Sequence, residues 1–189
     1  MTQSLPTIES STLESLLSPS MVIFRERLQA NLDSMLVMAG HPNRLRPHCK
    51  THKMDRIIRL WVEQGVTKHK AATIAECEML AAAGATDVLL AYNPVGPNIN
   101  RVVALATKFS TCRFSVTTDH EKPLQQLSAA AAKANVTIGV MLDVNVGMDR
   151  TGITPDHPSA VPLYTQTSKL PGLRPAGFHV YDGHLRQMP

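Results

Sequence analysis

Aromatic residues are scarce in this chain of 189 residues, at 4% of the total, so a core must be built from the aliphatic side chains. The three cysteines, Cys49, Cys77 and Cys112, show no Cys-x-x-Cys spacing. Their odd number argues against a disulfide framework or a structural zinc site and fits a reducing cytoplasm. Neither a signal peptide at residues 1–14 nor an apolar run of membrane-spanning length is evident. We therefore expect a cytoplasmic protein with no membrane partner.

A strong charge of one sign is also missing, since Lys and Arg total 19 against 15 acidic residues, a net charge of +4. The basic residues are scattered apart from Lys50–Lys53 and Lys68–Lys70, and no aromatic residues for base stacking lie near them. A nucleic-acid binder usually gathers such residues on one face. We expect no nucleic-acid partner, and a small anion such as a phosphate ester or carboxylate explains the surplus as well.

Short apolar runs alternate with amphipathic stretches from residue 20 onward, whereas residues 1–19 are rich in Ser and Thr and are expected to be flexible. The predicted strands are Met21–Phe24, Leu45–Cys49, Lys68–Ala72, Val88–Tyr92, Arg113–Val116, Val136–Val144 and Ala176–Tyr181. The predicted helices are Arg27–Ala39, Asp55–Gln64, Thr73–Gly84, Asn98–Lys108, His120–Ala134 and Ser159–Ser168. Thr73 and Glu76 have the spacing of a capping box at the start of their helix.

This alternation predicts an α/β fold in which helices cover a parallel sheet. A repeat of about 25 residues suits either a (β/α) barrel or a doubly wound sheet. No Gly-x-Gly-x-x-Gly follows a strand, and no Gly-x-x-x-x-Gly-Lys occurs, although nucleotide-binding sheets usually carry one of these motifs. The absence favours the barrel, and residues 20–189 are predicted to form one barrel domain.

Polar segments follow the ends of several predicted strands, where a barrel carries its working residues. These segments are Arg46–Lys53, Asp143–Gly152 and His179–His184. Lys50 has the position that Schiff-base chemistry needs, because a half-buried mouth and neighbouring cations, Arg46 and Lys53, would disfavour its ammonium form. The ordinary alternative is that these lysines only solvate a loop.

Other polar residues near these strand ends have weaker claims. His48 and His52 lack the helical His-x-x-x-His spacing and a nearby acidic partner, so no metal site is predicted from them. His69 lies between two lysines and is expected to be solvated. Cys49 is a poor candidate for a nucleophile, because it should point away from Lys50 and lacks a paired histidine.

The segment from His179 to His184 and the residue Arg150 fit a ligand site better. His179 alternates with Tyr181, so both could face the barrel interior, while His184 lies on the loop beyond them. Arg150 follows a glycine-containing turn, where a guanidinium suits a carboxylate, a phosphate or a phenolate. A surface salt bridge is the ordinary alternative for Arg150.

Taken together, these segments resemble the fold type III pyridoxal-phosphate (PLP) enzymes, which share the alanine racemase N-terminal barrel. The resemblance is to the D-threonine aldolase and D-serine dehydratase branch and covers the chain from about residue 19. It is carried, in the family's order, by Arg46–Lys53, Thr73–Leu80, Gly84–Tyr92, Val144–Gly152 and Gly172–His184. The first of these is similar to the branch's signature around its PLP lysine.

The resemblance implies that Lys50 binds the PLP aldehyde and later carries the Cα proton. It places Arg150 near the cofactor's phenolic oxygen and Tyr181 against the pyridine ring, with His179 and His184 on the substrate side. The implied substrate is a small D-β-hydroxy-α-amino acid, cleaved by a retro-aldol reaction to glycine and an aldehyde. A D-serine dehydratase reaction is the alternative within the branch, and a homodimer is usual in the family.

The family pattern is incomplete in this chain, because only about six of the eight barrel strands are predicted. The C-terminal β-domain is absent, and with it the ligands for the manganese or zinc ion that the branch uses, so no metal ligand is assigned. We expect a truncated product rather than a chain completed by association. Two other functions stay open, namely a non-catalytic PLP-binding protein for cofactor homeostasis and an inactive fragment.

Overall fold

The computed structural model describes residues 7–186 and divides into two compact units, Met1–His41 and Pro42–Pro189. In the described part of the first unit, α1 spans Ser10–Ser15 and α2 spans Arg25–Ala39. The prediction of a strand at Met21–Phe24 is wrong, because this stretch is extended but pairs with no strand. Helix α2 ends at Gly40, whose φ of 72° places it in the left-handed region, and the predicted helix stop there is confirmed.

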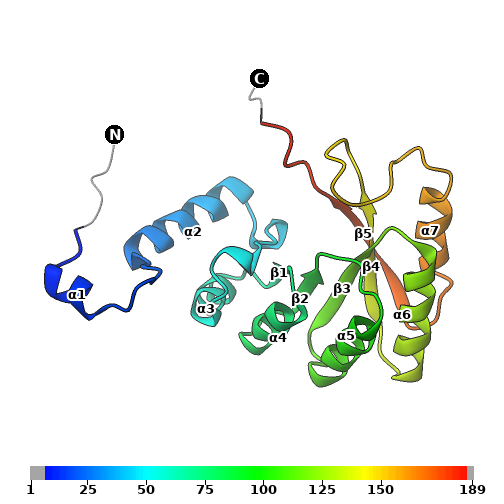
Figure 1. The fold of residues 1–189 in the computed structure, drawn as a ribbon, viewed down its shortest axis with the longest axis horizontal. Coiled ribbons are helices and arrows are strands. Elements are labelled where there is room, and N and C mark those ends of the chain that lie inside the picture. The colour runs from blue at the N-terminus through cyan, green and yellow to red at the C-terminus, as the bar shows by residue number, and fades with distance from the viewer. Residues whose placement is uncertain (1–6, 187–189) are drawn as a thin grey trace. The chain divides into compact units, whose positions relative to one another are not determined.

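The second unit contains a five-stranded parallel sheet with the strand order β1-β2-β3-β4-β5 (Figure 1). The strands are β1 (Lys68–Ala71), β2 (Asp87–Leu90), β3 (Arg113–Thr118), β4 (Ile138–Val144) and β5 (Leu173–Val180). A doubly wound sheet reverses its strand order near the middle, whereas a barrel adds each strand beside the last. The unbroken order therefore confirms the barrel type, and five strands make it an incomplete barrel.

The strand predicted at Leu45–Cys49 does not form. His48 makes a single isolated bridge to Lys70, and the chain then turns through a 3-10 helix at Cys49–Thr51. Two local features stop a longer pairing: Pro47 has no amide hydrogen to donate, and the His48 imidazole accepts the Lys50 amide, which favours the turn. The segment that carries Lys50 is therefore a turn beside the edge of β1.

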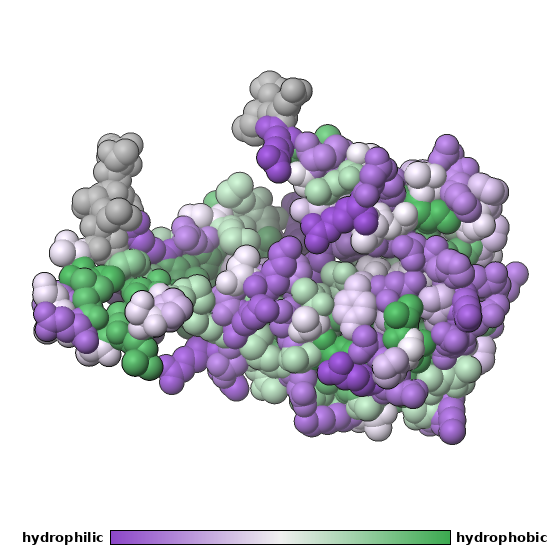
Figure 2. All heavy atoms as spheres, viewed as in Figure 1, coloured by the Kyte–Doolittle hydropathy of each residue, from purple (hydrophilic) through white to green (hydrophobic). Residues whose placement is uncertain are grey.

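Five helices cover one face of the sheet, and all lie in the second unit. They are α3 (Asp55–Glu63), α4 (Ile74–Ala82), α5 (Pro97–Lys108), α6 (Glu121–Lys133) and α7 (Ala160–Thr167). The capping box at α4 is confirmed, because Thr73 Oγ1 accepts the Glu76 amide at 3.1 Å, and Glu76 reaches back to the Ala72 amide at 2.7 Å. The outer surfaces of α5 and α6 are mainly hydrophilic (Figure 2), as amphipathic covering helices require.

The two faces of the sheet differ sharply in polarity. Alternate residues point toward the helices and join one hydrophobic core, which includes Val88, Leu90, Phe114, Val116, Val140 and Leu142. The other face carries Lys70, Asp87, Ser115, Thr117, Asp143 and His179, whose strand partners align them in register. In a (β/α) barrel this second face is the interior. Its polar side chains therefore lie where a barrel builds its site.

His69 lies on the helix-covered face and is fully buried, so the expectation that it is solvated is wrong. Its Nε2 lies 3.0 Å from the Val66 carbonyl oxygen, while its Nδ1 has no hydrogen-bond partner in the described part of the chain. Burial lowers the pKa of His69 from 6.5 to about 4, and the positive charge of Arg46 acts in the same direction. Strand alternation would have placed this residue opposite Lys70, and that signal was overlooked.

The buried His69 makes stability depend on pH. Because the unfolded chain binds this proton more readily, the stabilisation is fully present above pH 6.5 and is lost as pH falls toward about 4. Replacing His69 with glutamine, which keeps a donor for Val66, is expected to remove on the order of 2 kcal/mol of this acid-induced loss. Urea unfolding of both proteins at several pH values measures the difference. An unchanged acid slope, equal to that of the exposed-site control His184→Gln, would contradict the assignment.

Candidate active site

A chain of hydrogen bonds joins three strands at the carboxyl end of the polar face. Lys70 Nζ of β1 lies 2.7 Å from His179 Nε2 of β5, and His179 Nδ1 lies 2.7 Å from Asp143 Oδ1 of β4. The His179 and Asp143 side chains are only 11% and 8% exposed. Because an ammonium group can only donate, Nε2 must accept from Lys70, so Nδ1 carries the imidazole hydrogen and donates it to Asp143. With Lys70 as the donor, the two contacts orient the His179 imidazole with Nδ1 toward Asp143 and Nε2 toward Lys70.

Three cations meet at this end of the sheet. Burial lowers the pKa of Lys70, as do the positive charges of Lys50 and Arg150, whereas Asp143 raises it. Lys50 and Arg150 thus lie close enough to Lys70 to act on its charge, although they come from different loops. The mixture of three positive groups with one carboxylate favours an anionic ligand.

Lys70 was not among the residues that the sequence pointed to as functional. The basic stretch Lys68–Lys70 was noted only as a charge cluster. Position 70 lies on the polar face near the end of β1. The alternation of side chains along a strand predicts this face for Lys70 only when the alignment of β1 with β4 and β5 is known. That alignment requires the tertiary structure.

Lys50 lies within the 3-10 turn beside β1, and its side chain is exposed rather than half-buried as expected. Arg46 and Lys53, the cations expected to act on it, are engaged elsewhere. Arg46 lies 2.7 Å from Asp87 Oδ1, and Lys53 lies 3.3 Å from Glu76 Oε1. The cation whose charge is coupled to Lys50 is Lys70 instead.

Arg46 anchors the segment that carries Lys50 to the sheet. Its guanidinium contacts the carbonyl oxygens of His69 and Asp87, both at 3.3 Å, in addition to the Asp87 carboxylate. The same carboxylate accepts from Arg113 at 3.3 Å. Since the Asp87 side chain is only 12% exposed, this cluster fixes the start of the turn from the amino-terminal end of the polar face.

The loop after β4 positions Arg150. Asn145 Oδ1 accepts the amides of Gly147 and Asp149 at 3.0 and 3.2 Å, and its Nδ2 donates to the Asp149 carboxylate at 2.9 Å. Beyond the loop, Ile153 returns to β4 through a bridge to Val144. These contacts shape the loop before any ligand binds.

Arg150 lies next to Tyr181, the residue that follows β5. The guanidinium carbon is 5.4 Å from the centre of the tyrosine ring, a cation–π contact. His184 lies on the next stretch of chain and is exposed. The structure therefore gathers Lys50, Arg150, Tyr181 and His179 around the carboxyl end of the polar face, whereas His184 lies at its solvent-exposed margin.

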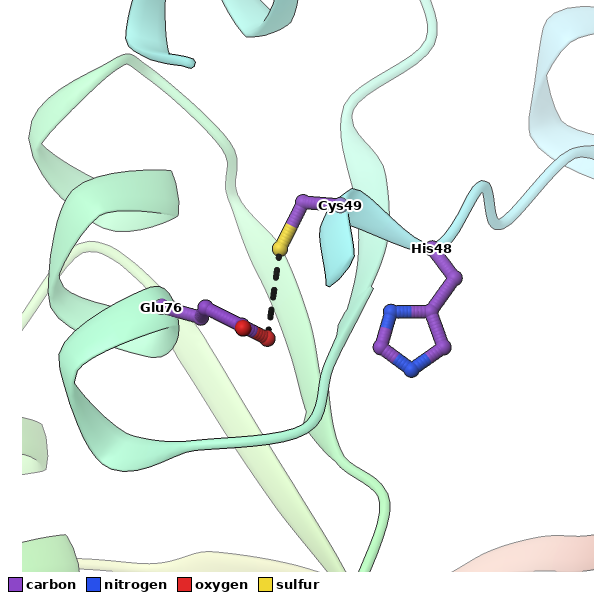
Figure 3. Close-up of side chains that lie close together, drawn as sticks. All are labelled: His48, Cys49 and Glu76. Atoms are coloured by element: carbon purple, nitrogen blue, oxygen red, sulfur yellow. Dashed lines mark hydrogen bonds between the residues drawn. The ribbon is translucent and has the colours of Figure 1, made fainter. Parts of the chain in front are cut away.

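His48, Cys49 and Glu76 offer metal-ligand atoms that all lie within 4.8 Å of one another (Figure 3). The arrangement does not fit a bound cation, because each of the three groups already has a partner within the chain. His48 Nδ1 accepts the Lys50 amide, and the Cys49 thiol lies 3.7 Å from Glu76 Oε2. Burial and the negative charge of Glu76 raise the pKa of Cys49 to about 12, so its thiol stays protonated.

The electrostatic surroundings also disfavour a cation at this place. Burial, together with the charges of Lys50 and Lys70, lowers the pKa of His48 to about 4. Lys53 already pairs with Glu76. We therefore assign no metal to this group.

The comparison with protein families gives one match, to the alanine racemase N-terminal domain, over residues 23–188. That range includes every strand of the sheet and every residue of the candidate site. The chain belongs to the alanine racemase N-terminal domain family.

Within this family, the similar curated proteins act on hydroxylated D-amino acids, by their names. The chain is 31% identical over 170 residues to a D-threonine aldolase of Arthrobacter sp., covering 89% of this chain and 44% of that protein. It is 26% identical over 187 residues to a 3-hydroxy-D-aspartate aldolase of Paracoccus denitrificans, covering 97% and 47%.

Solved structures agree with this placement. The D-threonine aldolase from Filomicrobium marinum superposes with a TM-score of 0.82 at 32% identity, covering 90% of this chain and 46% of that one. The D-threo-3-hydroxyaspartate dehydratase from Delftia sp. HT23 gives 0.74 at 25% identity, covering 89% and 44%. This member of the alanine racemase N-terminal domain family thus spans about half the length of the relatives that it matches. None of the helices in residues 7–186 is long and apolar enough to cross a membrane.

Proposed function

We propose that this chain is the PLP-binding portion of a lyase that acts on small D-β-hydroxy-α-amino acids, cleaving them as a D-threonine aldolase does. The observation that carries the proposal is the convergence of Lys50, Arg150 and Tyr181 on the carboxyl end of one polar sheet face. The family match and the names of the relatives support a proposal of D-amino-acid chemistry.

The residues present fit an anionic, planar cofactor. Arg150 supplies positive charge for the phenolic oxygen, and the Tyr181 ring offers a flat surface beside Arg150. PLP, when bound, supplies an electron sink for the bond-breaking step. Every other task falls to the chain: Lys50 offers the amine that binds the cofactor's aldehyde carbon and holds the Cα proton, and Arg150 stabilises negative charge on the phenolic oxygen.

His179 has a positioning task in this proposal. Asp143 fixes the orientation of its imidazole, and the imidazole in turn fixes the Lys70 amine at 2.7 Å. His184, at the exposed margin, would line the entry for the substrate. We further propose a cytoplasmic homodimer, on the basis of the buried free cysteines and the family resemblance.

The proposal predicts cleavage of D-threonine to glycine and acetaldehyde by the chain loaded with PLP, in the presence of manganese. L-Threonine should not react, and Lys50→Ala should abolish the reaction, whereas Lys53→Ala should retain most of it because Lys53 pairs with Glu76 away from the cofactor lysine. Glycine and acetaldehyde are measured together with ammonia, whose release marks a dehydratase.

The possible results separate the alternatives. Ammonia and a keto acid without glycine would identify a dehydratase. A chain that binds PLP through Lys50 but releases none of these products would be a non-catalytic PLP-binding protein or an inactive fragment of a lyase. A folded chain without any PLP binding would contradict the proposal altogether.

A further inference from the structure

The polar face contains one amine for which the proposed function has no direct use. Lys70 lies near the end of β1, and its Nζ reaches one hydrogen-bond acceptor among residues 7–186, the imidazole of His179. We propose that Lys70 binds a carboxylate group of the amino-acid substrate. This inference rests on the proposed function and adds to it the residue that recognises the substrate's acid group.

The hydrogen-bond chain prepares Lys70 for this task. A lysine side chain normally samples many rotamers, and ordering it costs free energy when a ligand binds. Here the contact with His179, itself held by Asp143, fixes the ammonium in advance. One N–H points to the imidazole, and an ammonium has three, so two remain for a ligand.

The charges around Lys70 favour an anion over any other partner. Lys50 and Arg150 add positive charge, and the single carboxylate that faces the amine, Asp143, is engaged by His179. Lys70 is also partly desolvated, which strengthens a charge-assisted hydrogen bond compared with one in water. Burial and then the charges of Lys50 and Arg150 lower the pKa of Lys70, and the negative charge of a bound carboxylate would act in the opposite direction.

The position of Lys70 points to the substrate rather than to the cofactor. In the proposed function, the cofactor's aldehyde lies at Lys50 and its phenolic oxygen at Arg150. The bridge between His48 and Lys70 places β1 beside the turn that carries Lys50, so Lys70 borders the place where an amino acid must sit to react at Lys50. The carboxylate is either the α-carboxylate that every amino acid carries or the side-chain carboxylate of a hydroxyaspartate, a compound that appears in the names of two relatives.

The test uses the cofactor-free chain and probes without an amino group, so that neither PLP binding nor turnover affects the result. D-Lactate carries one carboxylate and D-malate two. Dissociation constants are measured by NMR titration of the ¹⁵N-labelled chain. Lys70→Met, of similar length, is expected to weaken binding by about tenfold, which corresponds to about 1.4 kcal/mol.

Two further variants show whether the charge itself is responsible. Lys70→Arg keeps a cation and should retain binding to within about threefold. Lys68→Met is the matched control, because it removes the same charge two residues earlier on β1, where Lys68 holds the Asn43 carbonyl at 2.9 Å instead. It should leave binding unchanged, and circular dichroism confirms that each variant is folded.

The affinities of the variants for the two probes show whether Lys70 binds a carboxylate and which one. Weakened binding of both probes in Lys70→Met assigns the α-carboxylate, and weakened binding of D-malate alone assigns a side-chain carboxylate. Equal affinity in Lys70→Met and the wild type overturns the proposal, as does the absence of binding up to about 50 mM in the wild type, where a millimolar site would be saturated. Carboxylate binding that depends on Lys70 in a chain that does not take up PLP would instead overturn the proposed function.

Discussion

Replacing Gly152 with alanine is expected to lower the free energy of unfolding by about 3–4 kcal/mol, the sum of backbone strain and a steric clash. Gly152 has a φ of +93°, a conformation that L-residues rarely adopt. A Cβ atom there would lie 2.8 Å from the carbonyl carbon and oxygen of Asp143 and 2.9 Å from the Asn145 amide nitrogen. These are backbone atoms of β4 and its loop, so they cannot move aside as a flexible side chain could.

Gly147 provides the matched control, because it lies in the same loop with a φ of +106° but has only ordinary contact, at 3.5 Å, with His184. Gly147→Ala should therefore show the strain alone, about 1–2 kcal/mol. Chemical unfolding of the three proteins measures both values. Equal stabilities for Gly152→Ala and Gly147→Ala would contradict the close packing of the loop on β4.

The clash also has a consequence for the site. Displacing the Asp143 backbone would move the carboxylate that orients His179, and the loop between residues 145 and 152 carries Arg150. Any Gly152→Ala protein that remains folded should therefore bind PLP more weakly than Gly147→Ala does. The glycine thus couples the stability of the loop to the geometry of the site.

Much of the fold of the second unit could be predicted, because many of its strands and helices are indicated by local sequence patterns. The strands at Asp87–Leu90 and Ile138–Val144 are short, mainly apolar runs, and each is followed along the chain by a predicted helix. Such units need no long-range information to be recognised. The capping contact between Thr73 and Glu76 is likewise a local signal, and the structure confirms it.

The failures arise where tertiary contacts decide. Met21–Phe24 has the composition of a strand, but a strand needs a partner, and none pairs with it in the described part of the chain. Leu45–Cys49 reaches the sheet at one residue, because Pro47 and the His48 cap favour a turn. Amino-acid composition indicates which residues favour a strand. It does not indicate whether the edge of a sheet is available for them to pair with.

The candidate site was predicted in part for the same reason. The segments containing Lys50, Arg150 and Tyr181 could be identified from the sequence and from the family resemblance. Lys70 could not be identified in this way, because its place in the site depends on a contact with His179, which lies 109 residues away in the sequence. A partnership over such a distance leaves no trace in local periodicity.

Lys50 is the residue on which the whole account depends, and replacing it has the largest expected effect. If Lys50 alone bonds to the cofactor's aldehyde, Lys50→Ala should lose the borohydride-stable PLP adduct completely rather than by a small factor, because the other amine at this end of the polar face, Lys70, is held by His179. Lys53→Ala and Lys70→Met keep Lys50 and should retain the adduct. Lys53 is the closer control, because it is exposed and lies in the same segment.

The most direct test is therefore to incubate the folded chain with PLP, reduce it with borohydride and locate the pyridoxyl group by peptide mass spectrometry. The account predicts one modified lysine, Lys50, with no modification above background in Lys50→Ala. A pyridoxyl group on Lys70, or spread evenly over surface lysines in both proteins, would contradict it.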